Sequence, residues 1–421
     1  MPTTFRSSLT LALVVVLTGI GAGVGGMLLA LLLHGIQHLA YGYSLDSLDS
    51  LVGHETFLRG VTAASPERRL SVLMVCGLVA GCGWWAVYRY GRPLVGIKQA
   101  VPPGMPIMPP KTTLIHALLQ IITVALGSPL GREVAPREVG ALAGSWLSQR
   151  ARLTPQMHRL MVACGAGAGL AAVYNVPLGG AVFVLEVLVG AFSWPAAVIA
   201  LATSAIGAAV AWIGLGAESQ YVVPHFVLSP ALIIWAGVCG PLFGVAAYGF
   251  TRLTGTARAH AARGWRLPVL ALINFTLIGG LAMWLPQILG NGKGPAQLGF
   301  DNELTIGLAA LLLLVKVLIT TSSLRAGAEG GLLTPGLANG ALLAIILGGA
   351  WSLVWPGVPL GAFAIIGAAA FLAASMSMPL TAIVLVAEFT RIEHDFLVPI
   401  ILAVVGSMCV SKLCQRWENA G

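Results

Sequence analysis

Uncharged apolar runs recur along the whole chain of 421 residues, and this feature constrains the fold more than any other. Only 9% of the residues are charged, whereas a soluble domain normally has about 25%, so the chain cannot cover a large water-facing surface. About 20 helical residues cross a hydrocarbon core of roughly 30 Å. The clearest runs predict membrane-spanning helices at residues 9–35, 227–250, 268–288, 304–315, 331–350 and 396–410.

Two further apolar runs, residues 113–126 and 177–192, are too short or too rich in glycine for regular spanning helices. Irregular backbone at membrane depth is tolerated only where it lines a cavity or is buried in protein. The sequence therefore predicts an all-α polytopic membrane protein with some broken helices.

The net charge of +8 comes mainly from basic residues in short segments between the apolar runs. The positive-inside rule places these segments and the termini in the cytoplasm, and the acidic segment around Asp46, Asp49 and Glu55 outside. We expect a multi-pass protein of the cell (inner) membrane.

The six cysteines lack metal-ligand spacing, and no nucleotide-binding motif is present. We therefore expect no metal, nucleotide or nucleic acid as a partner.

Two segments of the chain are similar to each other. Residues 165–178 (GAGAGLAAVYNVPL) match residues 367–380 (GAAAFLAASMSMPL), 202 positions later, and Gly140 upstream has a counterpart in Gly340. Several matches in the same order, at a nearly constant offset, indicate a duplication.

The duplication predicts one membrane domain over residues 1–421, with related halves at about 70–215 and 227–412 and no C-terminal soluble regulatory domain. Repeated halves with broken helices are typical of transporters. In these proteins the substrate site lies near the membrane midplane, at the interface of the repeats.

Residues 127–138 (GSPLGREVAPRE) place charged side chains among glycines and prolines between apolar runs. An ionised group at the bilayer centre costs at least about 2.5–3.5 kcal/mol, so it needs a partner or a wet path. We interpret the segment as a helix N-terminus that binds an anion through its N–H groups, with the carboxylate of Glu133 competing for them. When protonated, Glu133 would leave, so it would be both gate and proton carrier. The alternative is an interfacial loop with an ordinary ion pair, such as Arg132 with Glu138.

Residues 327–335 (GAEGGLLTP) are the counterpart of this segment in the second half of the chain. Glycine lets backbone amides approach an ion closely. Glu329 is predicted to be either a proton-path or ion-site residue or a structural helix cap. Glu186 and Glu388 occupy equivalent positions of the repeat, which favours structural roles for both.

These motifs resemble the CLC family of chloride channels and proton-coupled anion antiporters, over residues of about 70 to 410. Residues 131–133 are similar to the family's Gly-Arg-Glu gate motif, which implies that Glu133 is the gating glutamate. Residues 330–335 resemble the Gly-Gly-Ile-Phe-Ala-Pro segment, whose backbone amides hold the anion. The resemblance implies an inverted repeat of tilted and broken helices, a homodimer with one pore per subunit, and no organic cofactor.

Departures from the family pattern bear on the transported ion. The chloride-coordinating serine falls on Val95, the central tyrosine aligns with His394, and the inner proton-transfer glutamate falls on Val187. The gate motif continues as Val134-Ala135 instead of Gly-Pro. This combination resembles the fluoride/proton antiporters of the family.

Three functions are candidates for this chain. The first is a secondary active antiporter that exports fluoride in exchange for protons, with Glu133 as gate and proton carrier and Glu329 assisting. The second is a chloride channel or a chloride/proton antiporter. The third is a membrane scaffold or membrane-embedded enzyme, which no catalytic constellation in the sequence favours.

The expected partners are an inorganic anion, protons, lipid and a second copy of the chain. The expected anion-binding residues are Val95, Gly96, Gly131, Arg132, Val134, Gly331, Leu332, Leu333, Thr334 and His394.

Overall fold

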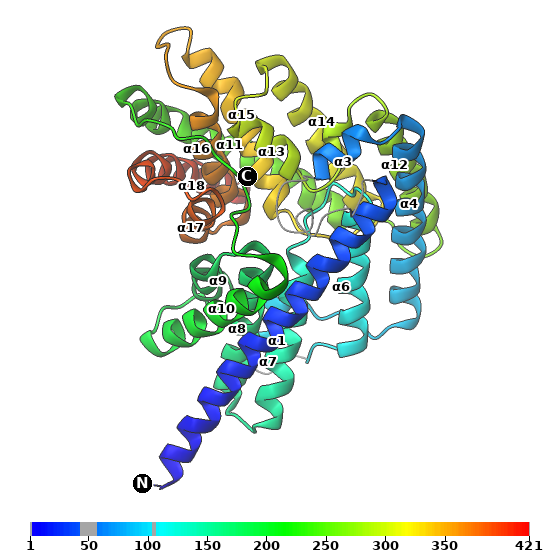
Figure 1. The fold of residues 1–421 in the computed structure, drawn as a ribbon, viewed down its shortest axis with the longest axis vertical. Coiled ribbons are helices and arrows are strands. Elements are labelled where there is room, and N and C mark those ends of the chain that lie inside the picture. The colour runs from blue at the N-terminus through cyan, green and yellow to red at the C-terminus, as the bar shows by residue number, and fades with distance from the viewer. Residues whose placement is uncertain (1, 43–56, 103–106, 421) are drawn as a thin grey trace. The chain divides into compact units, whose positions relative to one another are not determined.

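The computed structural model describes residues 2–42, 57–102 and 107–420 (Figure 1). The acidic segment around Asp46, Asp49 and Glu55 lies outside the described residues. Nearly all of the described chain is helical, which confirms the predicted all-α membrane fold. The α-helices are α1 (Pro2–Tyr41), α3 (Phe57–Ala63), α4 (Pro66–Tyr90), α5 (Ile97–Ala100), α6 (Pro110–Ala125), α7 (Val134–Arg150), α8 (Pro155–Tyr174), α9 (Pro177–Phe183), α10 (Trp194–Leu215), α11 (Pro230–Ala259), α12 (Arg266–Ala282), α13 (Lys293–Phe300), α14 (Ile306–Arg325), α15 (Leu333–Trp351), α16 (Leu360–Met376), α17 (Pro379–Thr390) and α18 (Leu397–Ala420).

Among the described residues, eight helical segments are long and apolar enough to cross a membrane. Six of them overlap the six apolar runs expected to span. The other two are α4 and α10, which the hydropathy pattern had not singled out. The run at 268–288 is shorter as a helix than expected, because α12 ends at Ala282 and the 3-10 helix η2 (Pro286–Ile288) follows.

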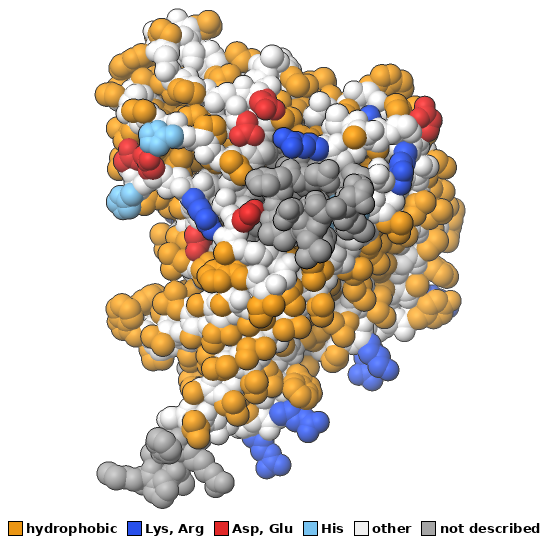
Figure 2. All heavy atoms as spheres, in the orientation of Figure 1, with side chains coloured by type: hydrophobic (Ala, Val, Ile, Leu, Met, Phe, Trp, Pro, Cys, Tyr) orange, Lys and Arg blue, Asp and Glu red, His pale blue; other side chains and the backbone are white. Residues whose placement is uncertain are grey.

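Large apolar side chains lie on the outer faces of the spanning helices. On α14, Leu311, Leu314 and Leu318 are 47%, 60% and 58% exposed. Hydrophobic side chains also dominate the face drawn in Figure 2, where charged side chains are few. A water-facing surface would not carry so much apolar area, so these faces are suited to lipid.

The interrupted segment at 177–192 is broken in the structure. Helix α9 covers only seven residues and continues as the π-helix η1 (Val184–Val189), which ends at Gly190 with φ of +68°. Such π-segments are rare and often lie at functional sites.

The chain divides into two compact units. Unit 1 comprises Met1–Gly35, Ala86–Ile122 and Arg132–Gln220, and unit 2 comprises Ile36–Trp85, Thr123–Gly131 and Tyr221–Gly421. In unit 1, α7 packs on α8, and α8 packs on α10. In unit 2, α11 packs on α18, and α15 packs on α16.

The corresponding helices of the two units have the same local design. Helix α8 ends at Asn175 with φ of 54°, and α16 ends at Ser377 with φ of 53°. In both cases the next helix begins with a proline, Pro177 in α9 and Pro379 in α17. A left-handed non-glycine residue is uncommon, so its occurrence at both places supports the predicted duplication.

Helix pairs in both units also meet through glycines. A Cβ built on Gly140 of α7 would lie 2.0 Å from the carbonyl oxygen of Gly165 of α8. A Cβ on Gly340 of α15 would lie 2.4 Å from that of Gly367 of α16. Small residues allow membrane helices to approach this closely. These are the residues that the internal similarity aligns, and they add a second structural argument for the predicted halves.

Candidate functional site

The two predicted glycine-rich segments are joined by hydrogen bonds. The N–H of Gly131 donates to the carbonyl of Gly331 at 2.7 Å, and the N–H of Gly331 donates to the carbonyl of Gly131 at 2.9 Å. This isolated antiparallel bridge lies within unit 2. A Cβ on Gly330 would meet the Cβ of Leu130 at 2.6 Å, so a larger residue does not fit there without a shift. The structure thus brings Gly131 and Gly331, two predicted anion-binding residues, into direct contact.

Helices α7 and α15 begin in the same way. Their third residue is proline, Pro136 in α7 and Pro335 in α15. The first N–H groups of an α-helix have no acceptor within the helix, so proline is tolerated in the first turn. Both helices are long, with 17 and 19 residues, and their N-termini carry partial positive charge. Each N-terminus is therefore suited to attract an anion.

Glu133 is the N-cap residue of α7 and is completely buried. Its side chain does not cap the helix. The hydroxyl of Tyr174 donates a long hydrogen bond of 3.5 Å to Oε2 of Glu133. The structure thus places Glu133 at a buried helix N-terminus, the environment that the gate hypothesis requires. Val134, the first residue of α7, is partly exposed.

Two arginines flank this carboxylate in unit 1. The guanidinium carbon of Arg132 lies 5.3 Å from the centre of the Tyr174 ring, which is a cation–π distance. The Nε of Arg137 donates to the backbone carbonyl of Glu133 at 2.8 Å. The alternative ion pair of Arg132 with Glu138 does not form, because Glu138 pairs with a histidine of α6 instead.

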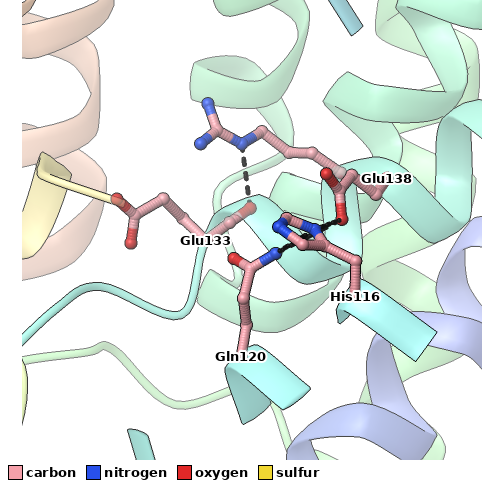
Figure 3. Close-up of polar contacts among 5 residues, drawn as sticks. His116, Gln120, Glu133 and Glu138 are labelled. Atoms are coloured by element: carbon pink, nitrogen blue, oxygen red, sulfur yellow. Dashed lines mark hydrogen bonds and ion pairs between the residues drawn. The ribbon is translucent and has the colours of Figure 1, made fainter. Parts of the chain in front are cut away.

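That pairing belongs to a buried polar cluster of His116, Gln120 and Glu138 (Figure 3). Nδ1 of His116 lies 3.0 Å from Oε2 of Glu138, and Gln120 Nε2 donates to the same oxygen at 3.3 Å. The histidines are dispersed along the sequence, and this cluster was not predicted from it. The spacing of four residues between His116 and Gln120 places both on one face of α6. This spacing is the feature of the sequence from which part of the cluster could have been predicted.

Glu329 lies three residues before Leu332, the N-cap residue of α15. The proton-path and structural-cap interpretations of Glu329 both stay predictions. Its Oε1 lies 4.0 Å from Nη1 of Arg263, and its side chain is 21% exposed. Arg258 donates to the carbonyl of Gly330 at 2.9 Å. This stretch is thus held by cations from the end of α11 and the segment after it.

The second-half candidates differ in burial. Leu333 and Thr334 are buried in the first turn of α15, whereas Leu332 is partly exposed. His394 is exposed in the 3-10 helix η3 (His394–Phe396), and we leave it out of the proposed site.

Val95 and Gly96 lie in unit 1, immediately before the four-residue helix α5. Val95 packs against an apolar cluster that contains Met108, Ala141 and Val162. The side chain at position 95 therefore makes apolar contacts and offers no hydroxyl to an ion.

Lys316 is a further basic side chain that the sequence motifs did not single out. It is fully buried in α14, and its Nζ donates to the carbonyls of Gly290 at 2.6 Å and Ile288 at 3.2 Å. These bonds hold the segment after η2, which gives Lys316 a structural role in unit 2.

Comparison with known proteins identifies relatives along most of the chain. The chain is 32% identical over 363 residues to a ClcB-like chloride channel protein of Ralstonia nicotianae, covering 80% of this chain and 81% of that protein. It is 30% identical over 418 residues to the voltage-gated ClC-type chloride channel ClcB of Citrobacter koseri, covering 94% and 96%. It is 28% identical over 431 residues to the H(+)/Cl(-) exchange transporter ClcA of Cronobacter sakazakii, covering 97% and 87%.

Solved structures share the fold. A slow cyanobacterial Cl-/H+ antiporter superposes with a TM-score of 0.83 at 19% identity, covering 96% of this chain and 95% of the other. A CLC-type fluoride/proton antiporter superposes with a TM-score of 0.74 at 20% identity, with the same coverage of 96% and 95%. At these identities the likeness concerns the fold alone. The family profile described as voltage gated chloride channel matches residues 72–412, and the chain therefore belongs to this family, the CLC family.

Proposed function

We propose that this protein carries chloride across the inner membrane by CLC-type transport, with Glu133 as the gate. The observation that supports this most directly is the complete burial of Glu133 at the N-terminus of α7. The protein is a multi-pass anion transporter of the CLC family, and its curated relatives are named as chloride channels or as a proton/chloride exchanger. The names of these relatives support chloride as the transported anion, whereas the sequence motifs indicated fluoride.

The proposed gating follows from competition for backbone donors. A carboxylate at a helix N-terminus interacts favourably with the same N–H groups and partial charge that attract an anion. Protonation removes the negative charge of Glu133. The side chain then binds the N–H groups more weakly than the anion does, and it moves out of the anion pathway. Anion flux should therefore rise as pH falls. A proton that enters on Glu133 and leaves on the other side gives coupled exchange.

Two helix N-termini are proposed to attract the anion, each within its own unit. In unit 1 these are the residues around Glu133 and Val134 at α7, and in unit 2 they are Leu332, Leu333 and Thr334 at α15. Glu329, which is partly exposed, is proposed as an assisting proton carrier between water and the pathway. The homodimer implied by the family resemblance and the cytoplasmic placement of the termini stay predictions.

Reconstitution in liposomes tests the function. Vesicles loaded with potassium chloride and given a potassium ionophore should release chloride, and a pH electrode should record protons moving in the opposite direction. Chloride release without proton movement would indicate a channel. Vesicles that release neither chloride nor fluoride would contradict the proposal.

Fluoride transport is a second candidate, and the apolar environment of Val95 favours it, because a chloride-binding hydroxyl is missing there. Val95→Ser is expected to raise the ratio of chloride to fluoride flux by about 2–12-fold, the effect of one hydrogen bond of about 0.5–1.5 kcal/mol. Val101 packs on the same apolar cluster, so Val101→Ser is the matched control and should leave the ratio unchanged. Equal changes in both variants would show that position 95 does not contact the ion.

A further inference from the structure

Three polar side chains are buried together between α6 and α7 in unit 1. His116 and Glu138 are 4% and 3% exposed, and Gln120 is fully buried. Figure 3 shows that the three side chains converge, whereas the side chain of Glu133 points away from them. An ionisable pair buried in a membrane protein is costly, so it calls for a function. The gating mechanism uses neither His116 nor Glu138.

Gln120 allows the pair to change its protonation state. Its Nε2 lies 2.9 Å from Nδ1 of His116 and 3.3 Å from Oε2 of Glu138. When His116 carries a proton on Nδ1, that proton is donated to Glu138, and Gln120 donates to the carboxylate as well. When Nδ1 is bare, Gln120 can donate to it. The cluster therefore keeps hydrogen bonds in either state, which a purely structural pair does not require.

Arg137 links this pair to the gate. Its guanidinium is nine-tenths buried and interacts electrostatically with Glu133, Tyr174 and Glu138. It also donates to the backbone carbonyl of Glu133 and lies 5.1 Å from the centre of the Phe183 ring. One buried cation thus bonds to the backbone of the gate residue and interacts electrostatically with the carboxylates of Glu133 and Glu138. A change of charge at either carboxylate alters the field at the other.

Two other helices pack against α7 near the pair. Helix α8 approaches α7 here through Gly165 and Gly169, and α1 approaches it through Ala22 and Gly25. Arg132, which stacks on Tyr174, is the further cation near the gate. Around the pair, Arg137 interacts electrostatically with Glu133, Tyr174 and Glu138, and Arg132 stacks on Tyr174.

We propose that His116 and Glu138 together form a second proton-binding site, which sets the pH at which Glu133 opens the anion pathway. This inference depends on the proposed gate role of Glu133. When the pair holds its extra proton it is neutral overall, and Arg137 stabilises the ionised, closed form of Glu133. When the pair loses that proton it carries a net negative charge, which favours the protonated, open form of Glu133. His116 and Glu138 are positioning residues for the gate, because they act through Arg137.

Substitutions in the pair should move the pH dependence of anion flux in opposite directions. Glu138→Gln removes the carboxylate, so Arg137 acts on Glu133 alone and the half-maximal flux should move to lower pH. His116→Gln leaves the carboxylate without its imidazole, so the half-maximal flux should move to higher pH. Each shift should be about 1 pH unit, the lower end of the effect of a nearby charge. The double variant should resemble Glu138→Gln, because the charge that His116 balances is gone.

The experiment is anion release from liposomes between pH 4.5 and about 8, the range in which carboxyl and imidazole groups titrate. His158→Gln is the matched control, because His158 bonds to Ser148 at the far end of α7, at 2.7 Å and without a carboxylate. Its profile should coincide with that of the unaltered protein. Gel filtration and thermal unfolding check that each variant is folded.

The outcomes separate this inference from the proposed function. If the unaltered protein releases anions with a pH-dependent rate and neither single variant shifts that profile, the second proton site is wrong and the gate stands. Shifts in the same direction also overturn it, since general destabilisation would produce them. If the unaltered protein releases no anion at any pH, the proposed function itself fails.

Discussion

Glu133→Gln is expected to abolish proton movement while anion flux continues. The glutamine has nearly the same shape as the protonated glutamate, so it does not compete with an anion for the N–H groups of α7. It also cannot carry a proton, and proton flux should fall by about 100-fold or to the leak of empty vesicles. The anion flux should lose its rise at low pH, because the titrating gate is gone.

Paired recordings with anion-selective and pH electrodes on the same liposomes measure both fluxes. Glu186→Gln is a suitable control, since Glu186 is a partly exposed carboxylate of η1 in the same unit. It should preserve proton coupling if its role is structural. Coupled proton movement that survives in Glu133→Gln would remove Glu133 from the mechanism and leave Glu329 as the remaining acidic candidate.

Gly140→Ala is expected to destabilise the protein strongly, although it adds only one methyl group. The added Cβ would lie 2.0 Å from the backbone oxygen of Gly165, and a backbone atom between two packed helices cannot rotate away. Overpacking of a core costs typically about 1–3 kcal/mol, and separating α7 from α8 would also disturb the residues around Glu133. Thermal unfolding in detergent should show a lower midpoint and a smaller folded fraction.

Gly249→Ala in α11 is the matched control, because nothing lies within 4 Å of a Cβ built there. Alanine has the higher helix propensity, so this variant should be neutral or more stable by up to about 1 kcal/mol. Gly340→Ala extends the test to unit 2 and should be as damaging as Gly140→Ala if the two helix pairs are equivalent. A Gly140→Ala protein as stable as the unaltered one would mean that α7 and α8 do not pack this closely.

The predicted and observed site agree where the determinants are local. The glycines and prolines of residues 127–138 interrupt one apolar run and precede another, so the helix start at Val134 could be expected from the sequence. The burial of Glu133 follows from its place between apolar runs. The partner of Glu138 was not predictable in this way, because His116 is 22 residues away and its position depends on how α6 packs against α7. The same holds for Arg132, which stacks on the ring of Tyr174 rather than pairing with Glu138.

By itself, the sequence determined that this is a helical membrane protein with two similar segments and a carboxylate at a helix start. These features depend on the composition and order of neighbouring residues, which set hydropathy, helix breaks and caps. Only the tertiary structure decided that Gly131 bonds to Gly331, that Glu138 pairs with His116, and that Glu329 lies near Arg263. A polar group that is removed from water needs a hydrogen-bond partner. Which partner it finds depends on how the helices pack, and the order of residues along the chain does not specify that packing.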